Sequence, residues 1–188
     1  MHVDLQQNRY AQALSAMMIY SYLTPLSAQE SKLLADLNLQ LGIPAKAAPL
    51  YEAALAEKSD GRLVRSLVLA LQQLGKTEQA LAALDRFHPS GKERRADLVM
   101  LRADLLYTLE RYDEAAEAYR RAANRDSAQA GRAWLMAGYA ALQSGDSGAS
   151  RQAFEKAATF QGQRRAARLA LQQLPVTGER QPGRRSRI

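Results

Sequence analysis

Residues 133–160 read "AWLMAGYAALQSGDSGASRQAFEKAATF", a stretch in which large and small apolar residues recur at helical intervals. Trp134 is followed four residues later by Gly138, and Phe154 is followed three residues later by Ala157. A catalytic motif would gather polar groups, whereas this spacing is typical of helices that pack closely against each other. Gly145 interrupts the periodic pattern, so the stretch predicts two short helices joined by a turn.

The same pattern recurs along the chain. A step of 35 residues back from Phe154 reaches Tyr119, a second step of 35 reaches Leu84, and a step of 33 reaches Tyr51. Four copies follow from this spacing, and they begin near Ala28, Gly61, Ala96 and Gly131. An internal repeat of this length indicates a repeat architecture in which each copy packs on its neighbours.

Each copy contains two helical segments, and a breaker separates them. Gly42, Gly75 and Gly145 provide the break in three copies, and the stretch "ERYDEA" provides it in the third. Helices this short must bury an apolar face to be stable. We expect small residues to allow close helix contact at positions 35, 103 and 138 of the first helices and at 47, 80 and 115 of the second, where the fourth copy has Ser150.

The spacing of Trp134, Gly138, Gly145, Phe154 and Ala157 resembles the tetratricopeptide repeat (TPR), a helix–turn–helix unit of about 34 residues. The resemblance implies an all-α fold, a right-handed superhelical solenoid of antiparallel helix pairs. It places the four repeats at 28–60, 61–95, 96–130 and 131–164. A partial repeat, mainly a second helix after a stub at 3–7, precedes them at 1–27, and a capping helix (165–174) and a disordered basic tail (175–188) follow. Trp134 is then a packing residue.

The composition argues against several classes of function. The 188-residue chain has no cysteine, and neither His2 nor His88 has a partner at metal-ligand spacing. No nucleophile with a base and no glycine-rich phosphate loop is present, so we expect no catalytic, cofactor or metal site. The net charge is +7, of which the last 14 residues carry +3. The remaining charges look interspersed, which disfavours nucleic acid as the partner.

In a repeat array of this kind the concave groove is lined by the first helix of each copy, and residues at its second, fifth and ninth positions face the groove. The candidate groove residues are Lys32, Asp36, Arg62, Arg65, Asp97, Met100, Asp104, Arg132 and Tyr139, with Gln29, Leu69 and Leu135 at the remaining places. Charged groups mixed with exposed Met, Leu and Tyr suit a peptide or protein partner. The sequence therefore predicts a non-catalytic interaction scaffold.

Some members of the TPR family hold a C-terminal carboxylate with a Lys and an Asn on the first helix of a repeat. The resemblance places Lys32 at the Lys position, but Asp36 replaces the Asn. Because Asp36 would repel a carboxylate, the chaperone-type function of those members is disfavoured here.

A narrower resemblance lies in residues 133–174, which are similar to the C-termini of bacterial TPR proteins found beside TonB–ExbB–ExbD energy-transduction systems. It implies a periplasmic accessory role, whereas a chain without a signal sequence would be cytoplasmic, and both stay open. A repeat domain appended to an enzyme and a nucleic-acid binder that uses the basic tail also stay open. The apolar stretch "YAQALSAMMIY" lacks a covering helix, so we expect a longer array upstream or self-association through this end.

Overall fold

The computed structural model describes residues 2–57, 60–86, 96–126 and 128–174, with side chains from residue 9 onward except at 96 and 97. These residues form ten helices and no strand, so the all-α class expected from the sequence is confirmed. The helices belong to two compact units, Met1–Leu98 and Val99–Ile188. The predicted disordered tail at 175–188 and the His88 loop lie outside the described residues.

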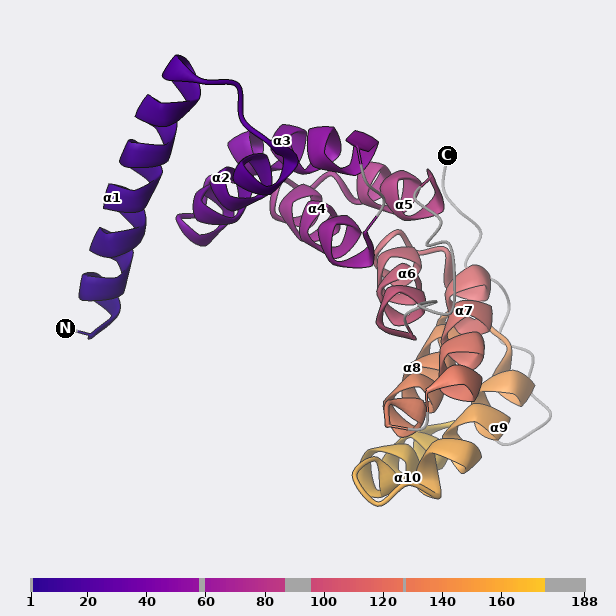
Figure 1. The fold of residues 1–188 in the computed structure, drawn as a ribbon. Coiled ribbons are helices and arrows are strands. Elements are labelled where there is room, and N and C mark those ends of the chain that lie inside the picture. Colours follow the sequence, from indigo (N-terminus) through magenta and orange to yellow (C-terminus); the bar gives the residue numbers. More distant parts are fainter. Residues whose placement is uncertain (1, 58–59, 87–95, 127, 175–188) are drawn as a thin grey trace, which may run out of the picture. The chain divides into compact units, whose positions relative to one another are not determined.

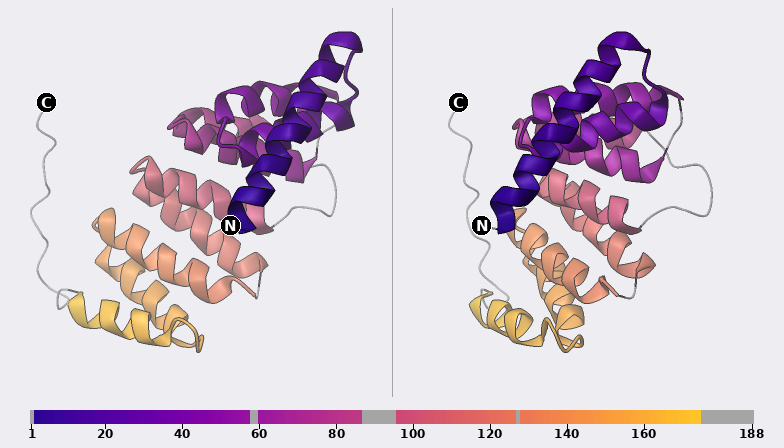
Figure 2. Two further views of the ribbon diagram at one scale, coloured as in Figure 1. Left: turned by 90° about the vertical axis from the view of Figure 1, so that its left-hand side faces the viewer. Right: turned by 60° about the vertical axis from the view of Figure 1, so that its left-hand side comes forward.

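The first unit holds five helices that pack in chain order (Figures 1 and 2): α1 His2–Leu23, α2 Ala28–Gln40, α3 Pro44–Glu57, α4 Gly61–Gln73 and α5 Thr77–Arg86. Ser27 caps α2: its hydroxyl accepts from the Glu30 amide, and the Glu30 carboxylate accepts from the Ser27 amide. Asp60 caps α4 by accepting from the amide of Arg62. Because these caps satisfy backbone N–H groups at the N-termini of α2 and α4, they fix the residues at which the two helices begin.

The second unit contains α6 Ala96–Thr108, α7 Tyr112–Arg125, α8 Ala130–Gln143, α9 Ser147–Ala158 and α10 Arg164–Gln173. Helices α7 to α10 each contact the next in the chain, and Figure 2 shows the same order from another side. In both units the first helices of the helix pairs lie in one layer and the second helices in the other (Figure 1). The layers place the first helices of a unit beside one another.

Helix α1 differs from the expected short stub followed by a second helix. Residues His2 to Leu23 form one continuous helix because no glycine or proline interrupts them. Leu14 is buried with Leu34 and Leu37 of α2, and the partly buried Met17 and Met18 pack on the same cluster. The expectation of a separate stub was therefore wrong, although the helix packs on α2 through an apolar face.

All four turns inside the helix pairs contain one residue in the left-handed conformation. Gly42, Gly75 and Gly145 have φ values of 71°, 70° and 88°, and Glu110 occupies the equivalent position of the third pair with φ 58°. Glycine adopts this conformation without steric cost, whereas in a residue such as Glu the Cβ atom makes the same conformation unfavourable. The glycines therefore end the first helices as the sequence indicated, and the third pair makes the same turn at a cost.

Small residues lie where the helices touch. Ala35, Ala47, Ala80, Ala103 and Ala115 are fully buried. In the fourth pair, a Cβ atom on Gly138 would lie 2.5 Å from the ring of Phe154, so only glycine fits there. Ser150, also fully buried, donates its hydroxyl hydrogen to the Gly138 carbonyl oxygen at 2.9 Å. This bond explains how a polar residue can replace the alanine of the other copies.

The large residues that recur at equivalent positions of the four copies are buried or partly buried. Tyr51, Tyr119 and Phe154 are fully buried, Leu84 is partly buried, and Trp134 is 9% exposed. The Lys156 ammonium group lies 4.1 Å from the centre of the Trp134 ring, a cation–π contact. Trp134 is thus a packing residue, as its spacing predicted. Among the described helices, none combines the length and the apolar character needed to cross a bilayer.

Candidate functional site

The first candidate surface lies on α2 and α4, which are the first helices of the two helix pairs in unit 1, and we call it the α2–α4 face. These helices touch each other (Figure 1), and the face comprises Gln29, Lys32, Asp36, Arg62, Arg65 and Leu69. Intervals of three, four and seven residues place the three residues of each helix on one side of it. Gln29, Arg62 and Arg65 are exposed, and Leu69 is 41% exposed. The face therefore presents cations beside an accessible aliphatic group.

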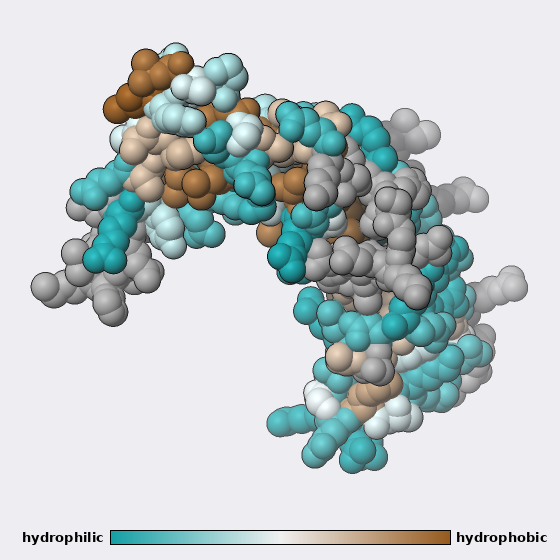
Figure 3. All heavy atoms as spheres, in the orientation of Figure 1, coloured by the Kyte–Doolittle hydropathy of each residue, from teal (hydrophilic) through white to brown (hydrophobic). Residues whose placement is uncertain are grey.

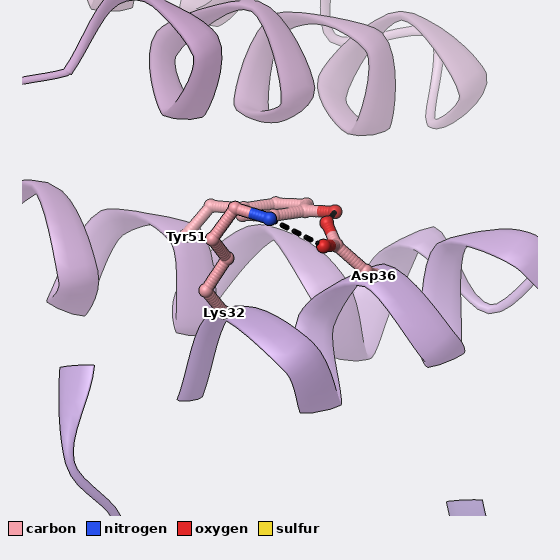
Figure 4. A network of polar contacts seen from close by, with 3 residues as sticks. All are labelled: Lys32, Asp36 and Tyr51. Carbon is pink, nitrogen blue, oxygen red and sulfur yellow. Dashed lines mark hydrogen bonds and ion pairs between the residues drawn. The ribbon is translucent and has the colours of Figure 1, made fainter. Parts of the chain in front are cut away.

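A polar network links α2 to α3 at the edge of this face (Figure 4). The Lys32 ammonium donates to Asp36 Oδ2, and the Tyr51 hydroxyl donates to Asp36 Oδ1, each at 2.6 Å. Burial and the hydrogen bond to Asp36 raise the pKa of Tyr51 above its ordinary value. Asp36 pairs with Lys32, and the guanidinium groups of Arg62 and Arg65 are exposed on the same face.

Unit 2 repeats part of this arrangement. The hydroxyl of Tyr119 on α7 donates to Asp104 Oδ1 on α6 at 2.6 Å. Burial and this hydrogen bond raise the pKa of Tyr119, and the nearby positive charge of Arg132 acts in the opposite direction. Arg132 is exposed on α8. Asp36 and Asp104 were predicted as groove residues, and in the structure each also anchors a buried tyrosine from the following helix.

The sequence contains a signal for these bonds that the groove interpretation overlooked. Each acceptor lies 15 residues before its tyrosine, and the same interval joins position nine of the first helix to the large packing residue in every copy. The four pairs are Asp36 with Tyr51, Leu69 with Leu84, Asp104 with Tyr119, and Tyr139 with Phe154. Each tyrosine is paired with a carboxylate that can accept its hydrogen bond, the leucine with a leucine, and the phenylalanine with another aromatic residue. This chemical match within each pair indicates contact between the two helices.

Three predicted groove residues of unit 2 pack inward. Met100 is only 5% exposed, so its expected exposure was wrong. Tyr139 stacks edge-on against Phe154 with ring centres 5.0 Å apart, and Leu135 packs on the same cluster, which includes Ala170 and Leu174. Apolar side chains at these positions gain free energy by leaving water, whereas Lys32 and Arg65 at the position of Met100 keep their charges solvated.

The last predicted groove residue, Asp97, lies in α6, but its side chain is outside the described part of the chain. Within the described residues, no group of three His, Cys, Asp or Glu side chains is arranged to hold a metal ion. The geometry thus pairs Lys32 with Asp36 on α2, which contacts the helix that carries Arg62 and Arg65, and it places both Asp104 and the charge of Arg132 near Tyr119 in unit 2.

Comparisons with solved structures agree with this fold. The chain is similar to YrrB, described as a TPR protein with an unusual peptide-binding site (TM-score 0.71, 19% identity, 91% of this chain and 88% of that one covered). It is also similar to MamA from Desulfovibrio magneticus RS-1 (TM-score 0.61, 20% identity, coverage 77% and 81%). A third similar structure is the TPR protein TTC0263 from Thermus thermophilus (TM-score 0.53, 20% identity, coverage 90% and 93%). At these identities the likeness concerns the fold.

No curated protein sequence matches the chain significantly. The sequence model of the tetratricopeptide repeat, in contrast, matches residues 2–62, 65–130 and 100–166. These matches span α1 to α9 and the turns whose geometry is described above. The chain therefore belongs to the tetratricopeptide repeat family.

Proposed function

We propose that this protein is a non-catalytic scaffold that binds a segment of a partner protein on its α2–α4 face. The TPR is a protein-interaction fold that is generally non-catalytic, and its members bind protein or peptide partners. One of the similar structures is described as having a peptide-binding site. The family supports the class of function, and the exposed residues of this chain indicate the surface.

The observation that carries the proposal is the exposure of Arg62, Arg65 and Leu69 on one side of α4. Arginine is enriched among residues that dominate binding energy, and an aliphatic group at 41% exposure can lose its water when a partner covers it. A matching segment carries carboxylates opposite the two arginines and an apolar side chain opposite Leu69. Lys32 contributes less because Asp36 neutralises it.

The test is a selection of random peptides displayed on phage against the full chain, followed by binding measurements by fluorescence polarisation. The test variant is Arg62→Gln with Arg65→Gln, and a second variant is Leu69→Ser. The control is Lys46→Gln with Lys76→Gln, which removes the same charge from exposed positions of unit 1 outside the face. We expect each test variant to weaken a selected peptide about tenfold or more and the control to leave it unchanged.

Two results would count against this face. If the selected peptides bind all three variants as tightly as the parent, the binding site lies elsewhere on the chain. If the test variants lose binding together with their helical signal, the residues have a structural role. Thermal melting followed by circular dichroism separates the two, because exposed side chains should contribute little to stability.

We also propose that α1 mediates self-association. Its C-terminal end exposes Ile19 (64%), Tyr22 (84%) and Leu23 (79%). Figure 3 shows hydrophobic residues, coloured brown, at this upper end of the helix. No charged residue occurs between Arg9 and Glu30. A second copy offers the same apolar surface, so an isologous contact would remove both from water.

A further inference from the structure

A second exposed surface, on α10, is not part of the α2–α4 face. It is an open hollow of about 360 Å³ lined by Gln161, Arg164, Arg165, Arg168, Leu169 and Gln172, and we call it the α10 surface. Its three arginines are exposed, and Leu169 is 51% exposed. The surface therefore combines cations, amides and one accessible aliphatic side chain within a single helix and the turn before it.

The positive charge of the chain gathers at this end. Residues 161–188 contain seven arginines and one glutamate, which give +6 of the total +7, so the preceding 160 residues are close to neutral. No acidic residue occurs from 161 to 174, and Arg164, Arg165 and Arg168 form no ion pair within the described part of the chain. Arg164 donates a long hydrogen bond from its Nε atom to the carbonyl oxygen of Ala158, at 3.4 Å.

A comparison with α4 indicates which sides of α10 these residues occupy. The sequence "LALQQL" occurs both at 69–74 and at 169–174, a separation of 100 residues. This register places Arg165 and Leu169 at the positions of Arg65 and Leu69, which are exposed. It places Arg164 and Arg168 at the positions of Val64 and Val68, which are buried in unit 1. The side of α10 that would pack on a further helix is thus basic and solvent-exposed.

We propose that the α10 surface docks an acidic segment of a partner protein that carries one aliphatic or aromatic side chain. The carboxylates of such a segment pair with Arg164, Arg165 and Arg168, and its apolar side chain covers Leu169. Arginine binds carboxylates in a planar, bidentate manner, and the two flanking glutamines supply further hydrogen bonds. The hollow gives the apolar group a place where water is displaced.

Two different classes of partner fit the surface less well. A nucleic acid gains nothing from Leu169 at the centre, and the described residues of α10 offer no aromatic ring on which a base could stack. A lipid bilayer requires several apolar side chains for insertion, but Ala167, Ala170 and Leu174 of this segment are buried. An acidic protein segment matches both the charge and the single exposed apolar group.

The experiment uses the full chain and a labelled synthetic peptide of about 14 residues, with glutamates and one leucine spaced for one face of a helix. The test variant is Arg164→Gln/Arg165→Gln/Arg168→Gln. The matched control is Arg120→Gln/Arg121→Gln/Arg125→Gln, which removes the same charge from exposed positions of α7 in the same unit. We expect the test variant to weaken binding about tenfold or more, and the control less than about twofold.

Two further measurements address the chemistry of the ligand. Replacement of the peptide glutamates by glutamine and the substitution Leu169→Ser should each weaken binding, the first more than the second. The proposal is overturned if the two triple variants bind the acidic peptide equally, or if the parent does not bind it. It is also overturned if single-stranded DNA or anionic vesicles bind through α10 more tightly than the peptide. These variants change only residues of unit 2, so a loss of peptide binding that Arg62→Gln with Arg65→Gln does not reproduce is assigned to the α10 surface and not to the α2–α4 face.

Discussion

The hydroxyl groups of Tyr51 and Tyr119 make equivalent hydrogen bonds to carboxylates, and both should make stability depend on pH. Burial and the neighbouring Asp raise the pKa of each tyrosine, so the folded protein holds the phenolic proton more tightly than the unfolded chain. Their contribution to stability is therefore complete below about pH 10 and falls as the pH rises above it.

We predict that Tyr51→Phe and Tyr119→Phe each lower the free energy of unfolding by about 1 kcal/mol at pH 7, because a hydrogen bond to a partly exposed carboxylate is lost. Above about pH 10 the difference from the parent should shrink, since the parent must then keep a buried phenol protonated. Urea unfolding at both pH values measures this, and Tyr22→Phe, at an 84% exposed position, is the control. A constant difference at all pH values would contradict the assignment.

Asn38 is a polar residue in an apolar position. It is 2% exposed, its amide donates to the Leu34 carbonyl oxygen at 2.8 Å, and its Oδ1 has no hydrogen-bond partner among the described residues. Leu71 and Leu106 occupy the equivalent positions of the next two copies, and both are buried. An unpaired buried oxygen costs free energy that an apolar side chain would not.

We predict that Asn38→Leu raises the free energy of unfolding by about 1 kcal/mol or more, because leucine replaces the unpaired oxygen. The reciprocal variant Leu71→Asn should lower it. Urea unfolding of both variants at neutral pH gives the comparison. A destabilised Asn38→Leu variant would mean that the oxygen has a partner that the hydrogen-bond pattern does not reveal.

At the scale of single residues, the sequence predicted packing better than exposure. The small size of Gly138 predicted close contact between its helix and the next, and in the structure the Phe154 ring lies against it. The burial of Met100 and Tyr139 was not predicted. Helical periodicity tells which residues share one face of a helix, but it does not tell which other parts of the chain cover that face. For Tyr139 the cover includes residues of α10, more than 30 positions away.

At the scale of elements, the turn at Glu110 is the exception among four equivalent turns. Its φ of 58° is a conformation that glycine adopts freely at the other three turns, and Glu110 is exposed, with its backbone amide bonded to the Tyr107 carbonyl oxygen. The left-handed conformation costs a residue with a Cβ atom about 1 kcal/mol or more. The third helix pair therefore carries a cost that the others lack.

We predict that Glu110→Gly stabilises the protein by about 0.5–1 kcal/mol, since the left-handed cost exceeds the extra entropy of glycine in the unfolded chain. Gly75→Ala should destabilise it by a similar amount. A Cβ atom on Gly75 would meet nothing within 4 Å, so the second change reports on the backbone alone. Thermal unfolding of both variants measures the effect, and equal melting temperatures would contradict it.

The elements themselves were largely predictable, because their boundaries depend on local chemistry. Gly42 and Gly75 follow α2 and α4 where the sequence indicated a break, and these two helices begin at Ala28 and Gly61, where the copies were predicted to begin. Helix α1 was not predicted correctly, since the repeat pattern suggested a break for which the local residues provide no signal. The arginines of α10 were interpreted from the sequence as the polar outer side of a capping helix and not as a binding surface, because the pattern of residues does not show the hollow that they line.

At the scale of the whole molecule, the apolar end of α1 predicts concentration-dependent association. We expect the mass measured by analytical ultracentrifugation to rise with protein concentration. Ile19→Glu with Leu23→Glu should weaken this association about tenfold or more, because a contact would then bury charge. These residues lie one helical turn apart, so a single contact would involve both.

The control for this prediction is Gln40→Glu with Ala53→Glu, which adds the same charge at exposed positions of α2 and α3. It should associate like the parent. A parent that stays monomeric over the whole concentration range would remove the support for an interface on α1. Equal weakening in both variants would show that net charge, not the apolar surface, controls association.

The pairs separated by 15 residues have a consequence for any attempt to build an idealised repeat from this chain. An averaged sequence would choose the commonest residue at each position separately, and could join the tyrosine of one copy to the leucine that another copy has at the position of Asp36. A buried hydroxyl would then face an aliphatic side chain, with no acceptor for its hydrogen. The two positions form one packing unit, so an exchange between copies succeeds only when both residues are transferred together.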